Sequence, residues 1–114
     1  MAVFASRQIV MPVLTIAVTI TGQGGDEYCC YAIINGTKQY RAGTHEVNAG
    51  DTITFGVFGQ DSMYNGTVTI DGTRVLNVDN SETRTYDWIV PEVSTVKIAM
   101  NYQSGKYGIT VTTA

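Results

Sequence analysis

Charged side chains are scarce in this sequence. Only 15% of its 114 residues are Asp, Glu, Lys or Arg, against about a quarter in a typical soluble domain. The net charge is −3, and no cluster of Lys or Arg offers the basic surface that neutralising phosphates requires. We therefore expect no nucleic acid among its partners.

Residues that usually carry catalysis or bind metals are also few. There is one histidine, His45, and the only two cysteines, Cys29 and Cys30, are adjacent. This set cannot close a tetrahedral zinc site. Neighbours on a strand point to opposite faces, so we expect no disulfide between the two thiols, one of them buried, and folding in a reducing compartment. A Cys–His pair is the enzymatic alternative, but no motif supplies its orienting group or oxyanion site.

The acidic residues suggest no catalytic or metal site. All ten are scattered along the chain, and most lie in turns, where Asp bonds its own backbone. Asp79, Asn80 and Glu82 offer oxygen ligands for calcium, but not at the alternating positions of a dedicated loop. No glycosidase pair can be chosen among them without geometry. The sequence thus predicts a protein that is not an enzyme, with no catalytic residue, no cofactor and no metal.

Helical and membrane-spanning segments are missing from the pattern. No window combines helical spacing with caps, and no apolar run is long enough to cross a bilayer as a helix. The apolar stretch at 9–18 follows Arg7, as in a signal peptide. Because its apolar residues alternate with Thr and Ala from Leu14 to Thr21, we predict a strand there instead. We expect no membrane partner.

What the sequence does contain is strands and turns. The phrase Ile-(Asn/Asp)-Gly-Thr-(Lys/Arg) occurs at 34–38 and again at 70–74. Asn-Gly and Asp-Gly favour the positive φ angles of two-residue hairpin turns. Short alternating segments separated by turn residues are typical of a β-sandwich. We place its strands at residues 13–21, 28–34, 38–41, 44–47, 52–58, 67–70, 74–78, 83–90, 96–102 and 107–113.

The tryptophan gives this sandwich a more specific type. Trp88 occupies an inward-facing position of its strand, which suits an immunoglobulin-like core, whereas the Cys…Trp…Cys pattern of antibody domains is missing. We therefore predict one all-β domain over residues 13–114, an immunoglobulin-like antiparallel β-sandwich. Residues 1–12 form an N-terminal arm, which either contacts a neighbouring subunit or adds an edge strand.

Tyrosine is the most suggestive residue for binding. The chain has seven, and Tyr64 and Tyr107 lie in turn-rich segments that we expect to be exposed. Exposed tyrosines provide contact area for proteins or sugar rings, although tyrosine is also simply favoured on sheets. With two residues of the arm, the candidate contact residues are Phe4, Arg7, Tyr64 and Tyr107.

Four phrases carry a family resemblance from Val47 to the end of the chain. They are Val47–Phe55, the hairpin Ile70–Thr73, the segment Thr85–Pro91 and the closing Tyr107–Thr113. They resemble immunoglobulin-like modules in virion proteins of tailed phages and related modules on bacterial surfaces. These phrases are turn and core residues, and such modules bring no catalytic residues with them.

The resemblance implies a virion protein assembled in the host cytoplasm. It would be a non-enzymatic capsid decoration or stabilising subunit, or a head or tail accessory protein. Its partners would be other virion subunits, such as the major capsid protein, and further copies of itself in a homo-oligomeric assembly. The alternative is a carbohydrate- or cell-surface-binding module that holds a glycan with its loop tyrosines.

Overall fold

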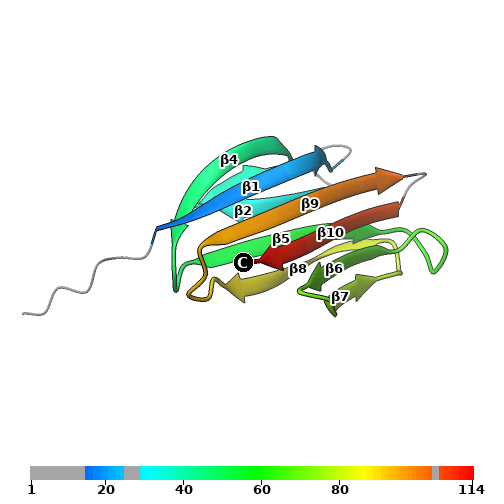
Figure 1. Cartoon of the computed structure of the whole chain (residues 1–114). Coiled ribbons are helices and arrows are strands. Elements are labelled where there is room, and N and C mark those ends of the chain that lie inside the picture. The colour runs from blue at the N-terminus through cyan, green and yellow to red at the C-terminus, as the bar shows by residue number, and fades with distance from the viewer. Residues whose placement is uncertain (1–14, 25–28, 104–105) are drawn as a thin grey trace, which may run out of the picture.

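The computed structural model describes residues 15–24, 29–103 and 106–114, and these ranges form β-strands without a helix (Figure 1). The arm at 1–12, with Phe4 and Arg7, lies outside the described residues. The strands are β1 (Thr15–Gln23), β2 (Cys30–Ile34), β3 (Thr37–Gln39), β4 (Arg41–Asn48), β5 (Thr52–Gly59), β6 (Gly66–Ile70), β7 (Thr73–Val78), β8 (Glu82–Ile89), β9 (Thr95–Gln103) and β10 (Lys106–Thr113).

The strands make two packed sheets, which confirms an all-β, sandwich-like architecture. The larger sheet has the order β4-β1-β9-β10-β6-β7, and the smaller one β3-β2-β5-β8. The prediction of purely antiparallel pairing is wrong, because β1 pairs with β9 in parallel and β6 pairs with β10 in parallel. The chain crosses repeatedly between the sheets before it returns beside β1, and such long connections permit parallel neighbours.

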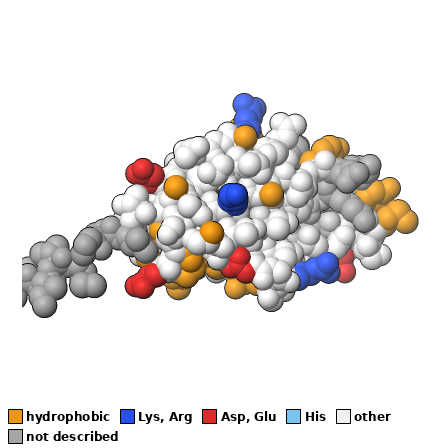
Figure 2. Space-filling view, in the orientation of Figure 1, with side chains coloured by type: hydrophobic (Ala, Val, Ile, Leu, Met, Phe, Trp, Pro, Cys, Tyr) orange, Lys and Arg blue, Asp and Glu red, His pale blue; other side chains and the backbone are white. Residues whose placement is uncertain are grey.

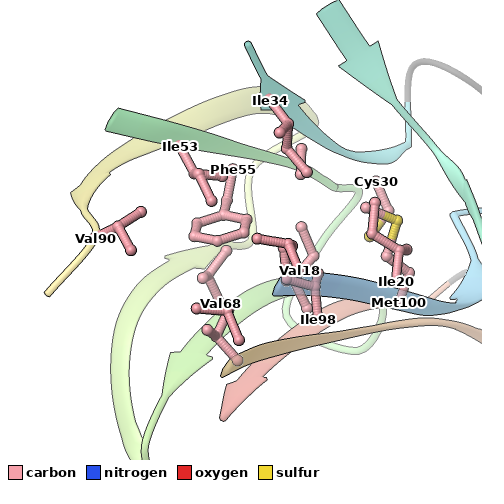
Figure 3. Packing of buried hydrophobic residues seen from close by; sticks show 14 of the residues in the cluster. Val18, Ile20, Cys30, Ile34, Ile53, Phe55, Val68, Val90, Ile98 and Met100 are labelled. Carbon is pink, nitrogen blue, oxygen red and sulfur yellow. The ribbon is translucent and has the colours of Figure 1, made fainter. Parts of the chain in front are cut away.

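The core lies between the two sheets (Figure 3). Alternate residues of β1 and β9 face alternate residues of β2 and β5, and Trp88 packs on Phe55 with ring centroids 6.0 Å apart. Burying each large side chain stabilises the fold by about 1.5–3 kcal/mol. Among the described residues no polar or charged residue is buried. The labelled core residues are Val18, Ile20, Cys30, Ile34, Ile53, Phe55, Val68, Val90, Ile98 and Met100.

Both repeated turns are confirmed. Asn35 and Gly36 have φ angles of 52° and 78°, and Asp71 and Gly72 have 47° and 84°, as a two-residue type I′ turn requires. The Asn35 side chain also donates to the carbonyl of Glu46 at 2.9 Å, which ties the first hairpin to β4. These turns therefore close hairpins and also hold neighbouring strands.

Asp71 fastens the second turn to the last strand. Its carboxylate accepts the Thr113 N–H at 2.9 Å and the Thr113 hydroxyl at 2.7 Å, and its own N–H donates to Val111 at 2.9 Å. The Thr113 N–H first, and its hydroxyl second, lower the pKa of Asp71 from its usual 3.8. The ionised carboxylate is thus the form that the folded protein prefers.

This pKa shift predicts a loss of stability in acid. A carboxyl whose pKa is lower in the folded state stabilises fully above its unfolded value of 3.8, and this contribution disappears as the pH falls through the folded pKa. Asp71→Asn keeps an acceptor oxygen but cannot titrate, so its unfolding free energy should fall less than that of the wild type between about pH 6 and pH 2.5. Urea unfolding at both pH values measures this, and equal losses in the two proteins would contradict it.

Candidate functional site

Four aromatic residues and one methionine, all at least partly exposed, lie at one end of the sandwich. They are Phe58 near the end of β5, Met63 and Tyr64 in the β5–β6 loop, Tyr102 near the end of β9 and Tyr107 near the start of β10. We call these five residues the aromatic end. The sheet register places Tyr107 beside Tyr102 on one side and beside Gly66, which follows the loop, on the other. Segments far apart in the sequence therefore meet here.

Three rings of the aromatic end pack in a row, with Tyr107 between Tyr102 and Phe58. Tyr102 and Tyr107 lie with centroids 5.1 Å apart at 31°, and Tyr107 meets Phe58 edge-on at 6.3 Å and 69°. Tyr107 also packs against the core, whereas Tyr102 is 52% exposed. The inner face of β9 is buried as far as Met100. Tyr102 is the next residue on that face and lies beyond the edge of the core. The ring of Tyr107 is thus held by packing, and the neighbouring ring of Tyr102 is exposed to solvent.

The β5–β6 loop holds its own shape. The Asp61 carboxylate accepts the backbone N–H groups of Met63 at 2.8 Å and Tyr64 at 3.0 Å, and the Gln60 N–H donates to the Tyr64 carbonyl at 2.9 Å. Met63 is left 65% exposed at the tip. Because the loop backbone is satisfied internally, a partner that binds Met63 pays little to order it.

The surface around this end is apolar and far from the start of β1. In Figure 2 hydrophobic side chains gather at the end of the molecule opposite the start of β1, further hydrophobic side chains lie along its lower edge, and charged side chains are few. A contiguous exposed apolar patch is the kind of surface that proteins use for interaction. The geometry therefore suits binding by burial of apolar and aromatic surface.

Two of the four candidate contact residues fall in this site. The structure places Tyr64 and Tyr107, both half-buried, at the same end. Sequence reasoning did not select Phe58 or Tyr102 as contact residues. The position of Tyr102, on the inward-facing side of β9 close to the end of that strand, is the feature that would have identified it.

The thiols are placed for structure rather than chemistry. Cys30 is fully buried in the core and its thiol donates to the Gly108 carbonyl at 3.6 Å, while Cys29 is half-exposed. Burial, and secondarily the neighbouring Cys29, raises the pKa of Cys30 to about 12. Cys30 is therefore a neutral thiol near pH 7, whereas a nucleophile must be a thiolate.

The other predicted ligand and catalytic groups are dispersed. His45 lies on β4 of the larger sheet, opposite Val18, whereas Cys30 belongs to the smaller sheet. Over residues 15–24, 29–103 and 106–114, no three His, Cys, Asp or Glu side chains gather closely enough to hold a metal ion. The same ranges contain no helix with the length and apolarity needed to cross a membrane.

Comparison with known proteins adds no relative. No family model matches the sequence, and neither the curated proteins nor the solved structures gave a match. The fold defines the class as an all-β protein of two packed sheets. Its function has to be argued from its surface.

Proposed function

We propose that the protein is a non-enzymatic structural subunit of a phage virion, which decorates or stabilises the capsid or serves as a head–tail accessory. The observation that carries the contact role is the aromatic end, where Met63 and Tyr102 are exposed, Phe58, Tyr64 and Tyr107 are half-buried, and hydrogen bonds to Asp61 fix the β5–β6 loop. The virion setting, and the immunoglobulin-like type of the sandwich, rest on the resemblance of the segments between Val47 and Thr113 to phage modules.

The aromatic end would act by burial against another virion subunit, such as the major capsid protein. Tyr102 and Met63 expose the most apolar surface there, and each Å² removed from water contributes about 25 cal/mol. Aromatic and Met side chains are enriched at the cores of protein interfaces. Further copies of the chain in the same assembly, built in the host cytoplasm, would multiply this contact.

The composition of particles tests the virion setting. Phage particles purified from the organism that encodes this chain should contain it in stoichiometric amounts by mass spectrometry. Particles made without it should bind the purified protein back, and should lose contents more readily on heating until they do. Complete particles that lack the protein and do not bind it would contradict the proposal.

Glycan binding is the second candidate, and the tilted pair Tyr102–Tyr107 favours it. An exposed ring backed by a second ring offers a flat apolar face of the kind that sugar rings contact. A glycan array probed with the wild type and Tyr102→Ala should then give a signal that depends on Tyr102. An array without any specific signal would rule out glycan binding and leave contact with another virion subunit as the proposed role.

A further inference from the structure

Strand β8 is an edge strand that is neither short nor irregular, although three of its residues, Glu82, Arg84 and Asp87, are charged. The other edges in the described part of the chain are blunted: β3 has only three residues, and the pairings of β4 and β7 each contain a register irregularity. In contrast, β8 pairs with β5 over eight residues without a register shift. Natural proteins shorten, bend or charge an edge strand when it must not pair with another chain.

The backbone of β8 offers a regular row of hydrogen-bonding groups. Val90, just after the strand, faces the β4–β5 turn, because its N–H donates to Asp51 and its carbonyl accepts from Gly50, both at 2.8 Å. The direction alternates along an antiparallel ladder, so Trp88, Tyr86 and Arg84 also face β5. The N–H and carbonyl groups at the open edge therefore belong to Thr83, Thr85, Asp87 and Ile89.

We propose that β8 pairs antiparallel with β8 of a second copy of this chain, with the two-fold axis at Tyr86. Thr85 then lies opposite Asp87, and Thr83 lies opposite Ile89. All four are edge-facing residues, so each pair exchanges two backbone hydrogen bonds. The two smaller sheets join into one continuous sheet, and the isologous contact closes as a dimer.

The side chains favour this register over its neighbours. Centring the pairing on Asp87 would set two carboxylates face to face, which is destabilising. Centring it on Thr85 would move Ile89 past the end of the opposite strand. At the Tyr86 register, Arg84, whose guanidinium is paired with Glu82 and exposed, lies opposite Trp88 of the second copy, a pair that permits a cation–π contact.

A second copy is the occupant because the edge is complementary to itself. Its outward row is Thr83, Thr85, Asp87 and Ile89, and in this register each threonine lies opposite the acidic or the apolar residue of the second copy. Ile89, 67% exposed in the single chain, would lie against Thr83 of the second copy. The β8 contact does not involve the aromatic end.

Sedimentation and light scattering from about 10 µM to 1 mM test the dimer directly. Thr85→Pro removes an edge-facing N–H that β5 does not need, and proline is tolerated on edge strands. It should weaken the dimer about 10- to 100-fold, since each copy loses a hydrogen bond. The matched control Thr85→Val keeps the N–H and should dimerise like the wild type. A wild type that stays monomeric at 1 mM, or a dimer unaffected by Thr85→Pro, would overturn the proposal.

Two charge substitutions at the same exposed position test the register if the proline variant does not fold. In Thr85→Lys the new ammonium group lies opposite Asp87 of the second copy and should tighten the dimer about 2- to 30-fold, whereas Thr85→Asp should weaken it by a similar factor. The opposite order would refute this register. Removal of residues 1–12 should leave the dimer intact; a folded truncation that is monomeric would show that the arm, and not β8, joins the copies.

Discussion

Gly59→Ala is expected to destabilise the protein by about 3 kcal/mol or more, because the new methyl group would clash with the neighbouring backbone. A Cβ at Gly59 would overlap the carbonyl of Val78 and lie 3.0 Å from the amide nitrogen of Asp79. Both obstacles are backbone, so no side chain can rotate away. The cost should be a large fraction of the total stability of a domain of this size.

A second glycine in a strand provides the control. A Cβ at Gly43 would meet only the His45 ring, at the ordinary distance of 3.5 Å. Gly43→Ala should therefore change the unfolding free energy by less than about 0.5 kcal/mol. Urea unfolding followed by the fluorescence of the single tryptophan, Trp88, measures both variants. Similar stabilities would mean that β5 and β7 do not approach as closely as described.

Truncating the aromatic end should remove most of its binding energy. The double variant Tyr102→Ala, Met63→Ala is expected to weaken binding to particles that lack the protein by about 100-fold, which corresponds to about 2.7 kcal/mol. Both side chains are more than half exposed, so the unfolding free energy should change little. Surface plasmon resonance on immobilised particles measures the affinity.

Ile89→Ala is the matched control for this loss. It truncates an equally exposed apolar residue, 67% against 65% for Met63, on a different strand and away from the aromatic end. Binding should be unchanged when it is measured at nanomolar protein, far below the concentrations at which the β8 dimer is tested. If Ile89→Ala weakens binding as much as the double variant does, the contact is not made by the aromatic end.

The sequence predicted local structure well because turns and alternation are local. Asn35-Gly36 and Asp71-Gly72 have one favoured conformation each, and both have it here. Alternation also indicated the strand β1, in which Ile16, Val18 and Ile20 are buried as the pattern implies. The predicted strands 38–41 and 44–47 became β3 and β4, which end and begin around Tyr40, where the chain passes from one sheet to the other.

Neighbours in the sheet could not be predicted in the same way. A pattern of alternate apolar residues says which side of a strand is buried, but not which strand lies beside it. The parallel contacts of β1 with β9 and of β6 with β10 follow from the path of the whole chain. The aromatic end was missed in part for the same reason, because Tyr102 continues an inward face and only the extent of the core leaves it exposed.

The parallel pairing of β1 with β9 has a consequence for how the protein is made. Ala17 lies beside Thr95, and Gly22 beside Met100, so the middle of the larger sheet is assembled from strands near opposite ends of the sequence. Contacts between residues so distant in sequence slow folding. During synthesis on the ribosome, β1 can pair with β4 but not with β9 until β9 has emerged. The edge of β1 that β9 later covers is exposed to other chains during that time.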